Sequence, residues 1–317
     1  MSNFVGNHAN KQNKINKKIV IPEKICIIVQ DVYANIQNNL QSSKLFINML
    51  YKLTEQIAEL GSPILKYYAF DWDDNIVTMP TRIFLLSDEG KEVGMTTEDY
   101  AKHRDKIGKE EFEYNGNNIV GFAENAFKNF RTEGNKDFLI DAMLAKPGPS
   151  WNDFVESING GSIFAIITAR GHSPETIKQG VYNYIISDFN GINRKELVKN
   201  LRKYRNIADD EDLSDIELIR EYLNLCKFYP VSYGNENELN PENAKVKALK
   251  EFSNYVKKLS SKLNQKAYLK NNVKNYFIPV IGFSDDDIKN ISKIKSHFKD
   301  QPEIKTYYTG KGRKEKY

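Results

Sequence analysis

The stretch at residues 67–77, YYAFDWDDNIV, decides how the rest of the chain is interpreted. An apolar run ends here in three carboxylates, Asp71, Asp73 and Asp74, that stand within four positions. Like charges this close repel one another, so each carboxylate needs a partner, solvent or a cation. The stretch is therefore either a solvated acidic turn or a metal-dependent site at the end of a buried strand. The order of apolar and polar segments in the rest of the chain distinguishes these two interpretations.

The composition is that of a globular protein. The 317 residues are 40% hydrophobic, 12% aromatic and 28% charged, which is enough for a core with a polar surface. We expect a cytoplasmic protein with no membrane partner, because neither a signal pattern nor a long apolar run is present. The two cysteines, Cys26 and Cys226, form no disulfide framework, which favours a reducing compartment. The net charge is +4, and the excess of basic residues lies at the two ends of the chain. We interpret these ends as solvated tails; the alternative is that they attract a polyanion weakly.

Apolar runs alternate with helical patterns along most of the chain. They predict strands at residues 64–70, in SIFAIIT ending at Thr168, and in YFIPVIGF before the acids of residues 284–287. Pro279 cannot donate to a strand ladder, so the last of these strands is expected to begin at Val280. The alternation predicts an α/β fold of the three-layer, Rossmann-like kind with a mostly parallel sheet. Functional loops of such sheets lie at the carboxyl ends of strands, where all three polar groups fall.

The pattern also divides the chain into segments. A hairpin is predicted in TRIFLLSDEGKEVGM, a helix with a threonine cap in TTEDYAKHR, and a helix capped by Ser150 after the Pro-Gly turn. The segments are a disordered tail (1–20), an N-terminal helical extension (21–63), an α/β core (64–77 and 147–310), an insertion (78–146), a helical excursion within the core (187–235) and a basic tail (311–317).

Four motifs carry a family resemblance. They are an apolar strand followed by Asp-x-Asp in YYAFDWDDN, an apolar strand ending in Thr in IFAIIT, lysines early in the helix NPENAKVKAL, and an apolar strand before paired acids in VIGFSDDD. In this order the motifs resemble those of the haloacid dehalogenase (HAD) superfamily of phosphotransferases, over roughly residues 65–310. The resemblance implies a HAD-like core, with residues 78–146 as a cap that selects the substrate. Many relatives have Gly where this chain has Asp74 and Thr where it has Asn75.

The chemistry of phosphoryl transfer gives the carboxylates different roles. Asp71, the first residue after the strand, is the expected nucleophile and forms an aspartyl-phosphate. Side chains alternate along a strand, which brings Asp73 to the same side, where it can protonate the leaving group and then activate water. A phosphate dianion cannot approach these carboxylates without a cation, which predicts Mg²⁺. The resemblance implies Asp71, Asp73, Asp285 and Asp286 as the metal site, and which of the last two binds directly stays open.

Further residues are expected around the phosphate. Thr168 is expected to donate a hydrogen bond to a phosphate oxygen, and Arg170 is a candidate substrate ligand. The resemblance implies a lysine that balances the charge of the intermediate. Lys245 is the first choice for it, with Lys247 as the alternative and as a candidate substrate ligand. His172 is interpreted as a structural loop residue rather than a contact of the leaving group.

Four other residues are weighed between structural and functional roles. Arg82 and Arg104, in the insertion, are interpreted as surface arginines, with substrate contact as the alternative. Trp72 and Trp151 are predicted to pack in the core rather than to stack on a ligand.

These features together predict a Mg²⁺-dependent phosphomonoester hydrolase, a HAD-type phosphatase whose partner is a phosphorylated substrate. The presence of Asp73 favours hydrolysis, because dehalogenase-like members of the superfamily lack this second acid. One alternative is a nucleic-acid 3′-end phosphatase, and a second is a catalytically silent HAD-fold binding or structural protein. The sequence leaves the identity of the substrate and the oligomeric state open.

Overall fold

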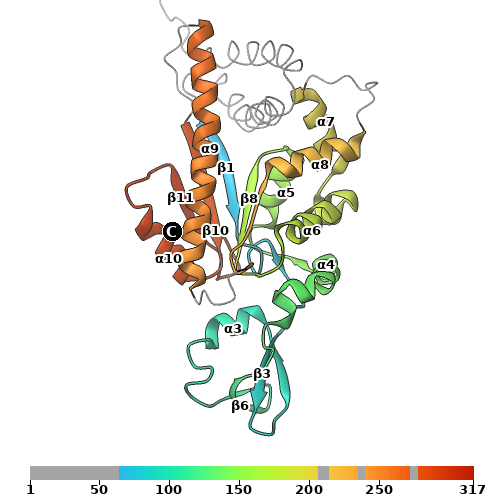
Figure 1. Cartoon of the computed structure of the whole chain (residues 1–317), viewed down its shortest axis with the longest axis vertical. Coiled ribbons are helices and arrows are strands. Elements are labelled where there is room, and N and C mark those ends of the chain that lie inside the picture. The colour runs from blue at the N-terminus through green and yellow to red at the C-terminus, as the bar shows by residue number, and fades with distance from the viewer. Residues whose placement is uncertain (1–63, 206–213, 235–239, 272–277) are drawn as a thin grey trace, which may run out of the picture.

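The computed structural model describes residues 64–205, 214–234, 240–271 and 278–317; the predicted tail 1–20 and helical extension 21–63 lie outside these ranges. A six-stranded sheet in the order β12-β11-β10-β1-β8-β9 forms its centre (Figure 1). Every pairing in this sheet is parallel except that of β11 with β12. The predicted α/β fold is confirmed. The strands are β1 (Ile64–Phe70), β8 (Phe164–Thr168), β9 (Lys227–Pro230), β10 (Ile278–Asp285), β11 (Ile304–Tyr308) and β12 (Glu315–Lys316).

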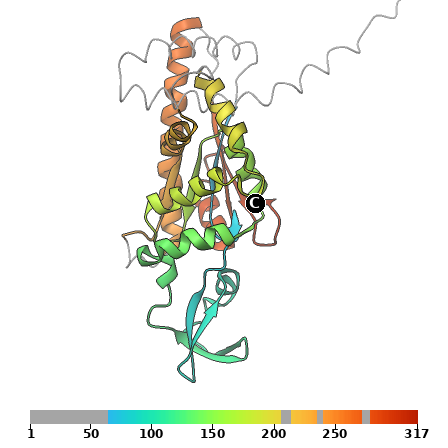
Figure 2. The ribbon, with the colours of Figure 1, turned by 90° about the vertical axis from the view of Figure 1, so that its right-hand side faces the viewer.

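Helices cover both faces of this sheet. Because side chains alternate along β1, Tyr67 contacts Phe252 of α9 on one face and Phe70 contacts Phe154 of α5 on the other. Helix α10 packs on α9 and α7 packs on α5, so these two pairs lie on opposite faces (Figure 2). Within the described ranges, every helix is either too short or too polar to span a membrane. The helices are α5 (Trp151–Asn159), α6 (Pro174–Ile186), the short η3 (Phe189–Gly191), α7 (Arg194–Arg205), α8 (Asp215–Leu225), α9 (Pro241–Asn271) and α10 (Ile288–His297).

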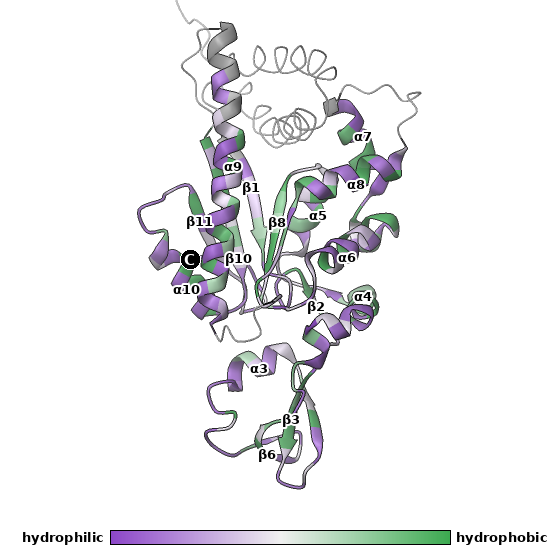
Figure 3. Cartoon of the chain, in the orientation of Figure 1, coloured by the Kyte–Doolittle hydropathy of each residue, from purple (hydrophilic) through white to green (hydrophobic). Residues whose placement is uncertain are grey.

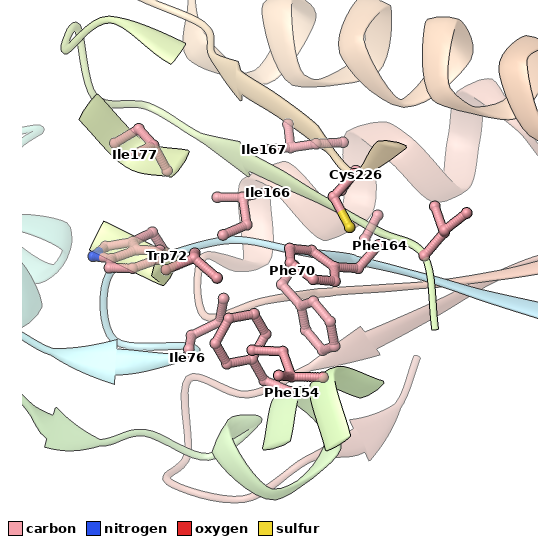
Figure 4. Packing of buried hydrophobic residues seen from close by; sticks show 14 of the residues in the cluster. Phe70, Trp72, Ile76, Phe154, Phe164, Ile166, Ile167, Ile177 and Cys226 are labelled. Atoms are coloured by element: carbon pink, nitrogen blue, oxygen red, sulfur yellow. The ribbon is translucent and has the colours of Figure 1, made fainter. Parts of the chain in front are cut away.

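The core between sheet and helices is built on aromatic contacts. All of β8 is buried, as expected for a central parallel strand covered on both faces, and its hydrophobic character stands out in Figure 3. Phe154 meets Phe70 and Phe164 edge-on, with ring centroids 5.6 and 5.4 Å apart (Figure 4). Trp72 is fully buried and stacks on Tyr184 with centroids 5.8 Å apart. This packing confirms the prediction that Trp72 lies in the core, and Trp151 is buried there as well.

Residues 78–134 form a unit with its own apolar cluster beyond the carboxyl ends of the strands, whereas the helix at 135–144 packs on α6 and contributes to the main core (Figure 1). The chain leaves and returns through a two-stranded ribbon in which Val77 pairs with Pro147. The predicted hairpin and the Thr96 cap are both confirmed, whereas β5 and β6, which complete a four-stranded antiparallel sheet, were not predicted. The elements are β2 (Val77–Thr78), β3 (Ile83–Ser87), β4 (Glu92–Met95), α3 (Thr97–His103), β5 (Phe112–Tyr114), β6 (Asn117–Phe122), η1 (Lys128–Phe130), η2 (Thr132–Gly134), α4 (Asn135–Leu144) and β7 (Lys146–Pro147).

A close backbone contact fixes the point where the chain re-enters the core. The N–H of Gly148 donates to the carbonyl of Ile76 at 2.8 Å. A Cβ atom at Gly148 would lie only 2.6 Å from the carbonyl oxygen of Asn75, so a larger residue would push the loop after β1 away. The Pro-Gly turn therefore also holds the loop that carries the carboxylates.

Two sequence-based expectations about strands are wrong. Strand β10 begins at Ile278 rather than Val280, and Pro279 pairs with β1. Proline is tolerated there because β11 joins β10 only from Ile281 onward, so Pro279 has one partner strand. The basic tail 311–317 is largely exposed, as expected, but it was not expected to contain a strand, and β12 pairs with β11 as an antiparallel edge of the sheet.

Candidate active site

The sheet brings the two acidic strand ends together. From β1 the chain crosses through α5 to β8 on one side, and from β10 it crosses through α10 to β11 on the other. Strands β1 and β10 are neighbours, and the helices that follow them lie on opposite faces, which is the point at which open α/β sheets have their binding crevice, at the carboxyl ends of the strands. Asp71 follows β1 and Asp285 ends β10, and the N–H of Asp71 donates to the carbonyl of Ser284 at 2.9 Å. Both carboxylates therefore lie at this crevice.

Lys245 lies between the two carboxylates. Its ammonium is 2.7 Å from Oδ2 of Asp285 and 2.9 Å from Oδ1 of Asp71, and the side chain is 2% exposed. Burial alone would lower the pKa of Lys245, but the charges of Asp285 and Asp71 raise it above its ordinary value, so the lysine is cationic. Lys247 is exposed on the same helix and points away from this group. Of the two candidates, the structure places Lys245 at the carboxylates.

Three carboxylates form a compact group at the crevice. Asp71, Asp285 and Asp286 each offer an oxygen within 4.8 Å of the others. Burial, followed by the charges of Asp285 and Asp73, raises the pKa of Asp71, and Lys245 only partly opposes this. Burial and the charges of Asp285 and Asp71 likewise raise the pKa of Asp286. One lysine against three carboxylates leaves an excess of negative charge, which a bound cation would balance.

The hydrogen bonds around this group test whether a metal ion fits. Asp285 accepts from Lys245, from Nδ2 of Asn290 at both of its oxygens, and from the N–H of Asp287, so its carboxylate is oriented by protein donors. Oδ1 of Asp71 is buried and, although close to Lys245, receives no well-directed hydrogen bond from the described residues. An all-oxygen donor set with one buried oxygen left without a donor suits a hard divalent cation such as Mg²⁺. Asp73 does not contribute its carboxylate to the group.

A buried amide, Asn75, ties three loops together. Its Nδ2 donates to the carbonyl of Asp71 at 3.0 Å and to Oγ of Ser284 at 3.0 Å. Its Oδ1 accepts from the hydroxyls of Ser150 at 2.9 Å and Thr309 at 3.0 Å. Ser150 stands at the start of α5 but makes no side-chain cap, which corrects the prediction from the sequence. The sequence did not predict the contacts of Asn75 with Ser150 and Thr309, because no local pattern connects these residues.

Asp73 and Arg170 face each other across the loops after β1 and β8. Nε of Arg170 donates to Oδ2 of Asp73 at 2.8 Å, and Nη2 donates to Oδ1 at 2.7 Å. Thr168, at the end of β8, is buried, and its Oγ1 accepts from the N–H of Arg170 at 3.3 Å. Arg170, predicted as a substrate ligand, is only 1% exposed and is committed to Asp73.

Asp74 occupies a third environment. Its φ of 53° lies in the left-handed region, which glycine adopts freely and which Asp tolerates better than most residues. Burial raises the pKa of Asp74 to about 6, while hydrogen bonds from Thr97 and Thr78 oppose the shift. Asp74 therefore meets the insertion through Thr97 rather than joining the other carboxylates.

The insertion also contacts the core through charged groups near the crevice. Nη2 of Arg104, at the end of α3, lies 2.8 Å from Oδ2 of Asp287 and 3.6 Å from Oε1 of Glu242. Lys289 and Asp105 form a second ion pair between core and insertion at 2.6 Å, although both side chains are well exposed. Arg104, for which the sequence left a surface role and substrate contact open, is thus paired with the core.

Comparison of the chain with known protein families, with curated proteins and with solved structures finds no match.

Proposed function

We propose that the protein is a Mg²⁺-dependent phosphomonoester hydrolase of the HAD type, acting through an aspartyl-phosphate on Asp71. The observation that carries the proposal is the buried oxygen of Asp71, which lies beside Lys245 and the other acids but receives no directed hydrogen bond. A nucleophile needs an oxygen that no directed hydrogen bond occupies, and a phosphate needs the nearby positive charge of Lys245. The four motifs that resemble the HAD superfamily support it, with the core at 64–77 and 147–310 and the insertion 78–146 as a cap.

The residues at the crevice suit a metal ion. Asp71, Asp285 and Asp286 would hold it through carboxylate oxygens, and the main-chain carbonyl of Asp73 is a further candidate ligand. Bound Mg²⁺ would supply positive charge against which the phosphate can approach the carboxylates. A cation here also favours the ionised form of Asp71, whose pKa is otherwise raised by burial.

The side chains of the chain itself can perform the reaction in two displacements. The carboxylate of Asp71 attacks phosphorus, the bond from phosphorus to the leaving oxygen breaks, and Asp73 gives that oxygen a proton. Asp73 then takes a proton from water, which attacks the aspartyl-phosphate and releases inorganic phosphate. Lys245 balances the charge that builds up on the transferred group, and the hydroxyl of Thr168 donates to one of its oxygens.

The test is phosphate release from para-nitrophenyl phosphate with Mg²⁺. Asp71→Asn keeps the size of the side chain but removes the nucleophile, and activity should fall to the background of the assay. Asp300→Asn, an exposed change after α10, is the matched control and should leave the rate unchanged. Equal rates in the wild type and Asp71→Asn would refute the assignment.

The same assay addresses the alternative of a nucleic-acid 3′-end phosphatase. Preference for a 3′-phosphorylated oligonucleotide over the mononucleotide, with a rate that falls steeply as salt rises, would favour it. Full-length protein that binds phosphate esters but releases no phosphate would favour the silent binding protein.

A further inference from the structure

The guanidinium of Arg170 is almost completely engaged inside the protein. Nε and Nη2 hold both oxygens of Asp73, Nη2 also donates to Oγ1 of Thr81 at 3.2 Å, and Nη1 lies 3.2 Å from Nε2 of His172. These contacts use four of the five N–H donors of an arginine. With 1% of the residue exposed, no face of the guanidinium is left for a substrate phosphate. Arg170 therefore acts on its neighbours rather than on the substrate.

The partners that hold Arg170 come from the insertion. The guanidinium carbon lies 4.6 Å from the ring centroid of Phe130 and 5.1 Å from that of Phe138, which places the cation beside two aromatic rings. Thr81, which accepts from Nη2, donates its own proton to Oδ2 of Asp141 at 2.7 Å. All four of these residues lie within 78–146, although Arg170 itself follows β8 of the core.

His172 extends this chain of contacts to a fifth residue of the insertion. A guanidinium can only donate, so Nε2 of His172 must accept and the ring proton must lie on Nδ1. Nδ1 lies 3.1 Å from Oδ1 of Asn135, the first residue of α4, and can donate to it. Burial and the charge of Arg170 lower the pKa of His172 to about 4, which agrees with a neutral ring. Asn135, His172 and Arg170 thus form a connected path that ends on Asp73.

We infer that Arg170 is a positioning residue, through which the insertion holds Asp73 in place for proton transfer to the leaving group. The inference rests on the proposed function. A two-point hydrogen bond from a rigid guanidinium fixes both the position and the plane of a carboxylate. Asp73 is held by this bond outside the group that Asp71, Asp285 and Asp286 form. Phe130 packs on the apolar cluster of the insertion and Phe138 lies on α4, which packs on α6, so the placement of the acid depends on the contact between the insertion and the core.

This role has a kinetic consequence that distinguishes it from others. An alkyl phosphate needs a proton on its departing oxygen, whereas para-nitrophenolate leaves without one. Displacing Asp73 should therefore lower kcat/KM, which reports the first displacement, far more for the alkyl ester than for the nitrophenyl ester. A residue that binds the phosphate would affect both esters alike and raise KM, and a purely structural residue would lower the active fraction equally for both.

The experiment uses Arg170→Lys in the full-length protein, with kcat and KM measured for ethyl phosphate and para-nitrophenyl phosphate. Lysine keeps the charge but cannot form the two-point contact. We expect kcat/KM to fall about 100-fold for ethyl phosphate and less than about tenfold for the nitrophenyl ester, without a rise in KM for either ester. Asp73→Asn should show the same preference, and adding Arg170→Lys to it should cause little further loss. Lys128→Met, which breaks an exposed ion pair with Glu92 of the insertion, is the control and should leave both rates unchanged.

Equal losses on the two esters, or a loss confined to KM, would overturn the inference. If Arg170→Lys does not fold, Thr81→Val replaces it, because valine matches threonine in shape and removes one acceptor of the guanidinium. It should reproduce the ester preference with a loss of about tenfold or less. The failure of the proposed function gives a different result, namely a wild type without Asp71-dependent phosphate release.

Discussion

Replacing Lys245 by methionine removes the cation that the structure places against two buried carboxylates. The ammonium lies 2.7 Å from Asp285 and 2.9 Å from Asp71, and the side chain is 2% exposed, so water cannot replace it without a rearrangement. Methionine keeps the length and the apolar stem of lysine. Lys247→Met makes the same chemical change two residues along the helix at an exposed position, and it is the matched control.

The expected loss of stability follows from the two uncompensated charges. Removing one partner of a buried ion pair costs about 3–5 kcal/mol of unfolding free energy, which for a chain of this size lowers Tm by about 10 °C. Lys247→Met should stay within about 0.5 kcal/mol of the wild type. Phosphatase activity should fall about 100-fold or more in Lys245→Met, because a charge that stabilises the transferred phosphate is lost.

The pH dependence of this loss has a defined sign. The folded pKa of Lys245 lies above its unfolded value, so its contribution is fully present at neutral pH and disappears only at high pH. In the variant, Asp71 loses the cation that opposed the effect of burial, and its folded pKa rises further. A carboxyl group with a raised folded pKa binds protons more tightly in the folded state. The deficit of Lys245→Met should therefore shrink as pH falls from 8 to 5.

Urea unfolding with a chelator present, followed by tryptophan fluorescence at several pH values, measures these quantities. Added Mg²⁺ should stabilise the wild type, because a ligand of the folded state shifts unfolding by mass action. Lys245→Met that is as stable as Lys247→Met at pH 8 would refute the interpretation of the buried cluster. So would a deficit that grows as pH falls.

Three further outcomes are expected. The pKa of His172 is lowered to about 4 in the folded protein, against about 6.5 in the unfolded chain, so acid favours unfolding. Between about pH 6.5 and pH 4, the wild type should lose up to about 3 kcal/mol of unfolding free energy relative to His172→Gln, measured by urea unfolding. Arg104→Met removes the ion pair with Asp287 and should raise hydrogen exchange in α3 by several-fold, measured by mass spectrometry, with Lys128→Met showing no such change. Asn75→Ala removes an acceptor of the buried hydroxyls of Ser150 and Thr309, together with the donor to Asp71 and Ser284, and should lower the unfolding free energy by about 2–4 kcal/mol, measured as a shift of the urea midpoint.

The parts of the fold that could be predicted depend on short-range patterns. Strand β8 is a continuous apolar run between Gly160-Gly161 and a polar loop, so both its type and its end at Thr168 follow from local sequence. The meeting of Asp71 with Asp285 also follows, because the ends of neighbouring parallel strands share one edge of the sheet. The apolar runs do not contain strand order, so they predict a shared edge for the two acids but not that β1 lies between β10 and β8, which makes the two acidic strand ends direct neighbours.

The choice between Lys245 and Lys247 shows that a usable signal can be overlooked. Lys245 precedes Leu249, Phe252 and Val256 by four, seven and eleven residues, the spacing of one helix face, and all three are fully buried. Lys247 falls outside this stripe. A lysine on the apolar face of a helix must find a buried partner, and the spacing of apolar residues around it is enough to select Lys245 from the sequence.

Other contacts had no such signal. Arg170 follows a strand end by two residues, which suits a phosphate ligand, and nothing near it in sequence indicates that Phe130 and Phe138 enclose it. Ser150 has the position of a helix cap, but its hydroxyl turns to Asn75. In both cases the competing partner comes from a loop far along the chain, so the outcome depends on tertiary packing rather than local preference.

The three neighbouring aspartates show how a loop can tolerate like charges. The side chain of Asp71 points to Lys245, and that of Asp73 points to Arg170, so two of the charges have separate cations. The backbone turns into the left-handed region at Asp74, and this third carboxylate leaves the strand direction toward the hydroxyls of Thr97 and Thr78. The repulsion between these neighbouring carboxylates is reduced mainly because their side chains point in different directions, each toward its own partners. A solvated acidic turn would need none of these partners, and the burial of Asp71 and Arg170 is incompatible with it.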